Sequence, residues 1–384
     1  MKNSYNYIVA LIIILLIGAF LRIYKLNQRP LYGDELMSLK WSSMSFSQYM
    51  STGALKGDEK PLYYIFLRFW RVFILDNVIS MRMISVVAGI LSILMLFFFA
   101  KRIVGVNVAI LSSFFMAISP FHVYYSQEIR MYVLEALFVL ISFYLFTNIF
   151  HKERVSKLLL VAYVLSSSVA IHFHITAFLG LIVQNIYFFI KRKDCALSVG
   201  GWLMSQVLIA VLTPQVLIPV LFIFGFKFGN WANYIPVVTQ SVYVKFPYLD
   251  LPKTYFIFTC GFVVRQFREN AALVIAVSLV SFPLFALGFS QAMKSIKREK
   301  HFLLVLLLSI VPVLFLFSLF NFLGNAYEYR SRYVMISSFA YYILLAQGAS
   351  CINSKTTRVA FITALVLLMF YSLYRYYAFN NLST

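Results

Sequence analysis

The stretch RMISVVAGILSILMLFFFAKR, Arg82 to Arg102, decides the fold. The eighteen residues between Arg82 and Lys101 carry no charge, and a helix of about 20 apolar residues crosses a bilayer. Similar apolar runs recur along the chain, at 7–24, 82–100, 106–121, 131–150, 158–175, 176–190, 199–224, 273–292, 302–320, 333–350 and 358–377. The sequence therefore predicts an all-α integral membrane protein, a polytopic bundle of about eleven transmembrane helices.

The composition agrees with this class. Of the 384 residues, 62% are apolar and 12% are charged, against about 45–50% and about 25% in soluble domains. This excludes a soluble domain, a disordered chain and a secreted disulfide scaffold. The first apolar run lacks a small-residue cleavage site, so we interpret it as a span and not as a signal peptide. We expect one transmembrane domain over residues 1–384 and no separate soluble domain.

The net charge of +20 comes from 33 Lys and Arg against 13 Asp and Glu. In a soluble protein this excess would suggest a nucleic-acid partner. Here the basic residues gather in short loops that alternate with the apolar runs, which is typical of cytoplasmic loops in membrane proteins. We therefore expect membrane lipids and no nucleic acid as partners. We expect a multi-pass protein of the plasma (inner) membrane with a cytoplasmic N-terminus, and eleven spans place the C-terminus outside.

In that topology two long connections, 25–81 and 225–272, face outward. Nine of the thirteen carboxylates lie at this outer face: Asp34, Glu35, Asp58, Glu59, Asp76, Glu128, Asp250, Glu269 and Glu328. We therefore expect the chemistry or binding of this protein at the extracytoplasmic face. Within the first connection, Pro61–Leu75 combines two arginines three positions apart with many aromatic residues, which predicts an interfacial helix.

Two motifs of the first outer connection carry acids. In RPLYGDELMSLKW, Arg29 to Trp41, the Asp34-Glu35 pair follows the first span. The pair is explained either by helix capping or by a general base held at the membrane surface. In GDEKPLYYIFLRFW, Gly57 to Trp70, acidic residues and a lysine precede a proline that would begin the interfacial helix. A plain solvated turn explains that second motif equally well.

A third motif, SPFHVYYSQEIRMYVLEAL, lies at the outer junction of two spans. It contains Tyr125, Glu128, Arg130 and Tyr132. An interfacial aromatic belt with a snorkelling arginine is one interpretation. If the stretch is a continuous helix, Glu128 and Glu135 share a face because they are seven residues apart. Glu135 lies inside a span, where an ionisable residue is a functional candidate by default.

Two further motifs remain ambiguous. His172-Phe173-His174 has two histidines at metal-ligand spacing, but no clear third ligand lies nearby, so we predict no metal site and leave a divalent cation open as a cofactor. In YEYRSRY, Tyr327 to Tyr333, the arginines anchor the chain at the interface, or Arg330 or Arg332 recognises a phosphate. The cysteines Cys195, Cys260 and Cys351 fit no metal or redox spacing. Nucleophile-elbow, P-loop, zinc-protease and dinucleotide motifs are missing, which disfavours ATP-driven transport and proteolysis.

The order of these motifs resembles that of the GT-C glycosyltransferases related to protein O-mannosyltransferases and to the ArnT aminoarabinose transferases. Four features carry the resemblance: the Asp-Glu pair after the first span, the PLYY helix, the YYSQEIRMY stretch, and the Arg332-Tyr333 step before a late span. The resemblance implies a hexosyl- or pentosyltransferase. Such an enzyme moves a sugar from a polyprenyl-phosphate-linked donor to an extracytoplasmic lipid, glycan or protein acceptor.

The resemblance also implies roles for single residues. Asp34 would be the general base, Glu35 would bind sugar or acceptor, Arg130 would hold the lipid phosphate, and Glu128 would shape the site. The other predicted substrate-binding residues are Glu59, Lys60, Tyr125, Tyr132, His174, Arg330, Arg332 and Tyr333. Glu59-Lys60-Pro61 replaces a His-Pro-Pro step frequent in the family, and the large soluble C-terminal domain of some relatives is missing. Acceptor docking would then use the loops.

A transporter or a lipid or polysaccharide flippase is the alternative from another class. Transporters often show paired halves with broken helices and charges near the bilayer midplane. No internal repeat is visible here, and the polar residues cluster at one face. This favours the enzyme over the transporter and over a non-catalytic assembly protein. A polymerase or ligase of surface polysaccharide remains an alternative within the enzyme class.

Overall fold

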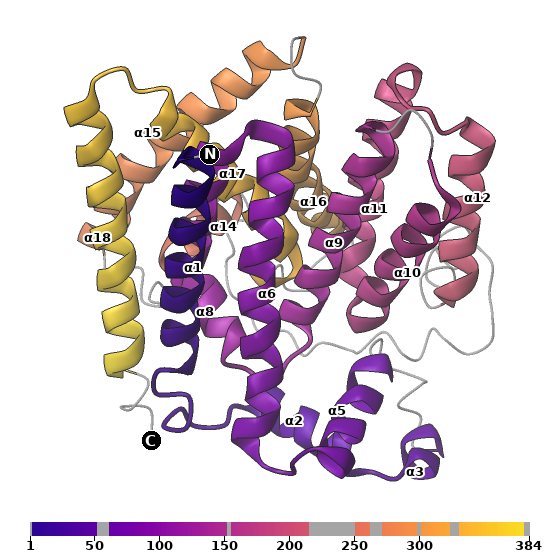
Figure 1. Cartoon of the computed structure of the whole chain (residues 1–384). Coiled ribbons are helices and arrows are strands. Elements are labelled where there is room, and N and C mark those ends of the chain that lie inside the picture. The colour runs from indigo at the N-terminus through magenta and orange to yellow at the C-terminus, as the bar shows by residue number, and fades with distance from the viewer. Residues whose placement is uncertain are drawn as a thin grey trace.

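The computed structural model of the chain describes residues 2–51, 61–151, 155–214, 250–261, 271–297, 301–322 and 330–379. All regular secondary structure in these ranges is helical. Figure 1 shows the long helices standing roughly side by side. The predicted all-α membrane fold is therefore confirmed. Four acidic or basic residues of the first outer connection, Lys56, Asp58, Glu59 and Lys60, lie outside the described residues.

Seven helical segments of the described chain are long and apolar enough to cross a membrane. They are α1 (Lys2–Ile23), α6 (Val78–Val104), α9 (Tyr132–His151), α11 (Phe178–Lys191) with its flanking 3-10 turns, α15 (Ala271–Ser295), α16 (Phe302–Phe322) and α18 (Lys355–Phe379). An eighth is the pair α7 (Val106–Ala117) and α8 (Pro120–Ser126), bent by 59°, if the pair counts as one span.

Three shorter helices complete the bundle: α10 (Lys157–Phe173), α12 (Val199–Leu212) and α17 (Met335–Ser350). Each of the eleven predicted apolar runs therefore contains a helix. The stretch 158–190 is split in two, because α10 ends at Phe173 and a 3-10 turn, η1 (Ile175–Ala177), precedes α11. Seven or eight crossings follow from length and composition, so the predicted count of eleven is not confirmed.

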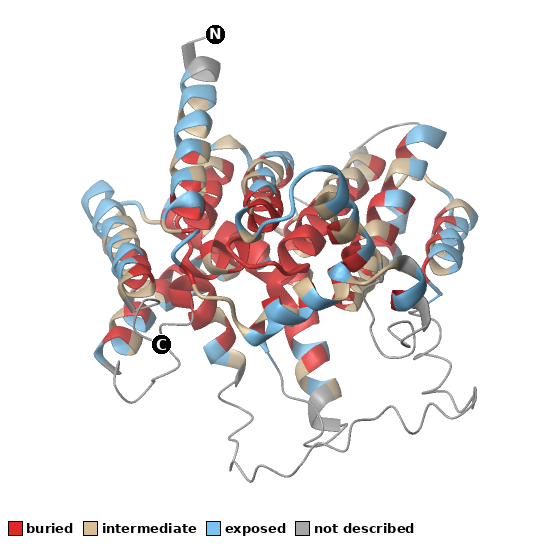
Figure 2. Cartoon of the chain, turned by 90° about the horizontal axis from the view of Figure 1, so that it is seen from below, coloured by how far each residue is buried: buried red, intermediate tan, exposed pale blue. Residues whose placement is uncertain are grey.

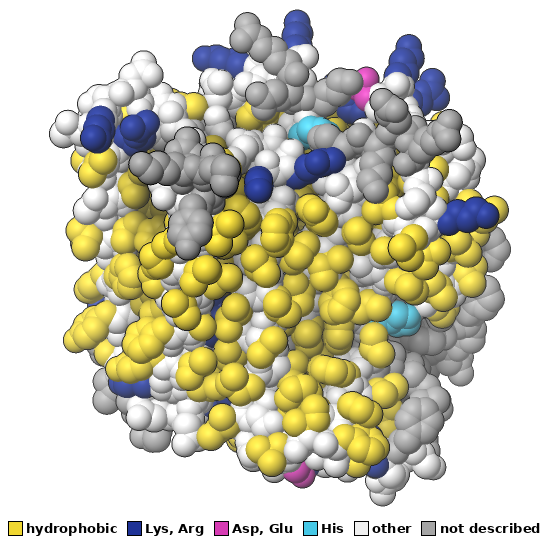
Figure 3. All heavy atoms as spheres, in the orientation of Figure 1, with side chains coloured by type: hydrophobic (Ala, Val, Ile, Leu, Met, Phe, Trp, Pro, Cys, Tyr) yellow, Lys and Arg dark blue, Asp and Glu magenta, His cyan; other side chains and the backbone are white. Residues whose placement is uncertain are grey.

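The first and last helices run in the same direction. In Figure 1 both α1 and α18 begin at the top and end at the bottom, and the rings of Tyr24 and Tyr377 lie 5.0 Å apart at their lower ends. This arrangement fits an odd number of crossings. In Figure 3 Lys and Arg side chains gather along the top edge, above a broad apolar band. The positive-inside rule would make the top edge cytoplasmic.

The break between α7 and α8 has an identifiable cause. Pro120 cannot continue a helix from α7 because it lacks an N–H donor, and the Ser119 hydroxyl caps the first turn of α8. The carbonyls of Met116 and Ala117 at the end of α7 accept from the buried guanidinium of Arg22 at 3.4 and 3.0 Å. The chain thus turns before the YYSQEIR stretch.

Three helices of the first outer connection lie across the lower end of the bundle in Figure 1: α2 (Gly33–Ser43), α3 (Phe46–Ser51) and α5 (Pro61–Phe73). The helix predicted for Pro61–Leu75 is α5. Its Arg71 donates to the Leu39 carbonyl of α2 at 3.2 Å, and its Trp70 indole donates to Ser80 of α6 at 2.8 Å. Of the second predicted connection, 225–272, the structure describes mainly α14 (Asp250–Cys260).

The centre of the bundle is α17, which is buried along almost its whole length. Figure 2 shows this pattern from below, with buried residues in the middle and exposed residues on the outer helices. Where α15 crosses α17, Gly288 and Gly348 bring the two backbones together. A Cβ atom on Gly288 would lie 1.9 Å from the Leu344 oxygen, so only glycine permits this approach.

Candidate functional site

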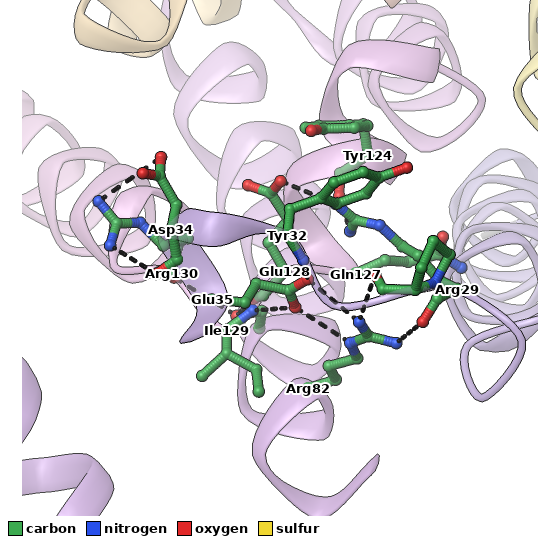
Figure 4. Close-up of polar contacts among 12 residues, drawn as sticks. Arg29, Tyr32, Asp34, Glu35, Arg82, Tyr124, Gln127, Glu128, Ile129 and Arg130 are labelled. Carbon is green, nitrogen blue, oxygen red and sulfur yellow. Dashed lines mark hydrogen bonds and ion pairs between the residues drawn. The ribbon is translucent and has the colours of Figure 1, made fainter. Parts of the chain in front are cut away.

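Two ion pairs are buried at the lower end of the bundle, and the first joins Glu35 of α2 to Arg82 of α6 (Figure 4). The Nε and Nη2 of Arg82 each donate to one carboxylate oxygen of Glu35 at 3.1 Å. The side chains of Arg82 and Glu35 are 1% and 0% exposed. Glu35 also accepts from the backbone N–H of Ile129 at 3.1 Å.

Arg82 makes further contacts with the chain that follows α1. Its guanidinium donates to the backbone carbonyls of Leu26, Arg29 and Pro30 at 2.8 to 3.2 Å. One guanidinium and one carboxylate thus tie together α6, α2, the segment after α1 and the segment before α9. This buried pair fixes the backbone from which Asp34 projects, because Asp34 directly precedes Glu35 in the first turn of α2.

The second buried pair joins Arg29 to Glu128. The Nη2 of Arg29 lies 2.7 Å from Oε1 of Glu128, and both side chains are almost fully buried. The guanidinium also lies over the ring of Tyr124, 4.6 Å from its centroid. Figure 4 shows this pair on one side of the Arg82–Glu35 pair, with Asp34 and Arg130 on the other.

Asp34 is the exposed carboxylate of the group. Its side chain is 50% exposed, and Oδ2 lies 3.0 Å from Nη1 of Arg332 and 4.0 Å from Nη2 of Arg130. Arg130 also donates to the Asp34 carbonyl at 3.2 Å and to the Ser38 hydroxyl at 3.4 Å. The structure therefore brings together the predicted base, the predicted phosphate ligand Arg130, and Arg332 from the far end of the chain.

The charges at this end do not cancel. Partial burial would raise the pKa of the Asp34 carboxyl, but the charges of Arg130 and Arg332 together outweigh burial and hold this pKa below its ordinary value. The two buried pairs are each neutral, whereas Asp34 faces these two guanidinium groups and also feels the charge of Arg330, so positive charge is in excess. Within the described chain, no acceptor reaches the buried Nε of Arg130 or of Arg332. The half-exposed part of the site around Asp34 therefore has the positive charge to attract an anion.

Aromatic rings form a platform beside the two arginines. We call Tyr132, His174 and Tyr333 the aromatic platform. The guanidinium carbons of Arg130 and Arg332 lie 5.6 and 5.3 Å from the centroid of the Tyr132 ring. The rings of His174 and Tyr333 are stacked at 5.7 Å, and Tyr132 meets His174 edge-on at 5.2 Å. Tyr125 is buried behind them, 5.6 Å from Tyr132.

The remaining predicted residues separate into groups. Arg330 is exposed at the start of the 3-10 helix η7 (Ser331–Val334) that carries Arg332. Glu59 and Lys60 lie outside the described residues. Glu128 and Glu135 do not share a helix face, because the chain forms turns between Ser126 and the start of α9 at Tyr132. In the described chain no group of three His, Cys, Asp or Glu side chains is placed to hold a metal ion.

Sequence reasoning missed Arg29 and Arg82 as members of the site. A signal was present, because the outer ends of spans usually carry few Lys and Arg. Arg82 stands at the outer end of a predicted span, and Arg29 stands next to Pro30 in the first outer connection. Arginines at the side of the membrane where basic residues are usually few, and close to the few carboxylates of the chain, indicate buried ion pairs between the two.

Comparisons with known proteins agree with this architecture. The family model described as dolichyl-phosphate-mannose-protein mannosyltransferase matches residues 58–218. ArnT from Cupriavidus metallidurans, which was solved alone and bound to undecaprenyl phosphate, is 15% identical with a TM-score of 0.58. That match covers 92% of this chain and 62% of ArnT. No curated protein matches the sequence.

A second group of similar structures comes from an archaeon. The oligosaccharyltransferase AglB from Archaeoglobus fulgidus, solved with an inhibitory peptide and a dolichol-phosphate, is 13% identical with a TM-score of 0.60. The match covers 97% of this chain and 55% of AglB. This chain therefore spans about three fifths of the length of these relatives. At such low identity the likeness establishes the fold, and it confirms the GT-C resemblance expected from the motifs.

Proposed function

The chain has the GT-C fold, and from this premise we propose that it is a membrane glycosyltransferase. It moves a sugar from a polyprenyl-phosphate-linked donor to an acceptor at the extracytoplasmic face. The observation that carries the proposal is the half-exposed carboxylate of Asp34 beside Arg130 and Arg332, where positive charge is in excess. The basic edge at the opposite end of the bundle supports an extracytoplasmic position for this site.

The proposed reaction needs few catalytic groups. The acceptor hydroxyl attacks the anomeric carbon, a carbon–oxygen bond forms there, and the bond from that carbon to the phosphate oxygen breaks. The phosphate leaves with the electron pair as a stable anion, so no general acid is required. Asp34 takes the hydroxyl proton, which is the role of the base carboxylate in inverting glycoside chemistry. Fixed guanidinium groups stabilise the charge that grows on the phosphate.

Residues of the site then have distinct roles. Arg130 and Arg332 bind the lipid phosphate, since guanidinium groups offer permanent charge and paired N–H donors. Glu35 and Glu128 are buried in ion pairs, so we propose that they position the backbone around Asp34 and do not touch substrate. Glu59, Lys60 and Arg330 remain proposed contacts of the sugar or the acceptor.

Binding of the donor phosphate is the first test. The purified protein in nanodiscs should bind undecaprenyl phosphate. Arg130→Ala should weaken this affinity about 10- to 100-fold, because a hydrogen bond to a charged group contributes about 1.5–3 kcal/mol. Arg130→Lys should recover part of the loss. Arg102→Ala, at the basic end of α6, is the matched control and should bind normally. If Arg130→Ala binds as well as Arg102→Ala does, Arg130 does not hold the phosphate.

Transfer is the second test. Undecaprenyl-phosphate-linked mannose and aminoarabinose, each labelled in the sugar, are incubated with the protein and a membrane extract as acceptor. Label that leaves the polyprenyl phosphate and appears on a new product supports the proposal. Movement of intact labelled donor across the bilayer, with no bond broken, would support the flippase alternative.

A further inference from the structure

An ionisable side chain buried in the first turn of α9 has no part in the proposed reaction. Glu135 is 2% exposed, and its Oε1 accepts from the Thr176 hydroxyl at 2.6 Å. The same hydroxyl lies 2.5 Å from Nδ1 of His174, which is itself 3.7 Å from Oε2 of Glu135. A carboxylate, a hydroxyl and an imidazole are therefore linked in series inside the bundle.

This series joins two elements that neighbour each other at the site. Glu135 lies one turn after Tyr132, at the start of α9. His174 directly follows α10, and its Nδ1 lies 3.3 Å from the backbone nitrogen of Thr176 in the 3-10 turn η1. The series thus connects the start of α9 to the turn between α10 and α11, and each of these elements supplies one ring of the aromatic platform.

The platform in turn contacts Arg332. The His174 ring lies parallel to the Tyr333 ring within 13° and meets the Tyr132 ring edge-on. The guanidinium carbon of Arg332 lies 5.3 Å from the centroid of the Tyr132 ring and 5.6 Å from that of Tyr333. An arginine held over ring faces gains a favourable cation–π contact whose strength depends on where the rings lie.

A neutral network on the same helices shows why a carboxylate needs a separate explanation. Ser142 of α9 and Ser167 of α10 are hydrogen-bonded at 2.8 Å, and Gln184 of α11 donates to Ser142 at 3.0 Å. These neutral groups already join α9, α10 and α11. Burying a charge within a bundle is costly, whereas a hydrogen bond to a charged group is shorter and roughly twice as strong as a neutral one.

We infer that Glu135, Thr176 and His174 form a positioning relay that fixes the aromatic platform and, through it, the place of Arg332 beside Asp34. None of the three touches substrate. The relay deepens the proposed function, on which it rests, by assigning a role to residues behind the reacting groups. The relay requires a hydroxyl at position 176 that donates to the Glu135 carboxylate and accepts from the Nδ1–H of His174.

The first experiment tests the relay without any ligand. Thr176→Val removes the hydroxyl and keeps the shape, and it is combined with Arg332→Ala in a double-mutant cycle read by apparent thermal unfolding midpoints in one detergent. If the relay holds Arg332, the two changes are not additive, because Thr176→Val costs less when Arg332 is already absent. Ser167→Ala is the matched control and should combine additively with Arg332→Ala. Additive midpoints for Thr176→Val as well would overturn the relay.

The second experiment measures undecaprenyl phosphate affinity. We expect Thr176→Val to weaken it about tenfold, as expected when a charge-assisted contact is partly lost, whereas Thr176→Ser and Ser167→Ala stay near the unmodified protein. Glu135→Gln, which keeps an acceptor oxygen but removes the charge, replaces Thr176→Val in both experiments if the valine variant does not fold. If the unmodified protein does not bind undecaprenyl phosphate, the proposed function fails, and the unfolding cycle still decides on the relay. Equal affinities for Thr176→Val and Ser167→Ala would contradict the relay alone.

Discussion

Asp34 and Arg332 are separated by 298 positions in the sequence, and their Oδ2 and Nη1 atoms are 3.0 Å apart. This contact joins α2 to the 3-10 helix η7 that precedes α17, and it makes Arg332 a competitor for the carboxylate that we propose as the base. A donor phosphate, with at least the charge of a carboxylate, would draw Arg332 and Arg130 toward itself. The base would then be released when the donor binds.

The first prediction concerns Asp34→Asn. The change keeps the shape and removes the base, so sugar transfer should fall by about 10²–10⁴-fold, the usual contribution of a positioned base. Affinity for undecaprenyl phosphate should be kept or increase, because the carboxylate no longer competes for Arg332 and Arg130. The measurements are the initial transfer rate and phosphate affinity in the same nanodiscs. Loss of phosphate binding in Asp34→Asn would show that Asp34 is a binding residue and not the base.

The second prediction concerns pH. Asp34 must be deprotonated to act, so the transfer rate is lost as pH falls through its pKa, which the two arginines hold below the ordinary value. Arg332→Ala removes one of these charges, so the pKa of Asp34 in the donor-free enzyme rises and the acid limb of the kcat/KM profile moves to higher pH. Arg332→Ala also lowers the maximal rate, because Arg332 is a proposed phosphate ligand. The midpoint of the acid limb is therefore compared between the two proteins after each profile is scaled to its own maximum. An unmoved limb in Arg332→Ala would mean that Asp34 is not the titrating group.

Much of the fold could be predicted from the sequence because lipid imposes a simple rule. An uncharged run such as 83–100 has no alternative to a helix in a bilayer. The break between α7 and α8 was harder to predict, because the run 106–121 includes Pro120 only near its end. The crossing of α15 and α17 could not be predicted, since Gly288 and Gly348 lie 60 positions apart and only the packed structure shows that they meet.

The site was predictable only in part. The motif order predicted Asp34 and Arg130 as partners in one site, and they lie together at the lower end of the bundle in Figure 1. Glu35 was predicted to bind sugar or acceptor, in a direction different from that of Asp34, because consecutive residues project in different directions. Glu35 therefore points inward to Arg82. That pairing depends on tertiary packing, which a local motif does not contain.

The third prediction tests the close crossing of α15 and α17. Gly288→Ala places a Cβ atom 1.9 Å from the Leu344 oxygen, so the helices must separate. We expect a destabilisation of about 1–3 kcal/mol or more, as for overpacked cores. Gly200→Ala in α12 is the control, because its Cβ would meet nothing within 4 Å and alanine is the better helix former by about 1 kcal/mol. Apparent thermal unfolding midpoints compare the two. Equal midpoints would contradict the tight crossing.

The last prediction separates a positioning role of Glu35 from the substrate-binding role that the sequence suggested. Glu35→Gln leaves Arg82 buried without its carboxylate, and breaking a buried ion pair in this way costs about 3–5 kcal/mol. Asp34→Asn, one position away, removes a half-exposed carboxylate and should cost less than about 1 kcal/mol. Thermal unfolding of the two variants in one detergent should therefore show a large fall for Glu35→Gln and a small one for Asp34→Asn. The double change Glu35→Leu with Arg82→Met should recover part of the loss, since an apolar pair needs no charged partner. If Glu35→Gln instead unfolds at the unmodified temperature while the KM for donor or acceptor rises, Glu35 contacts substrate, and the carboxylate must leave Arg82 during the reaction.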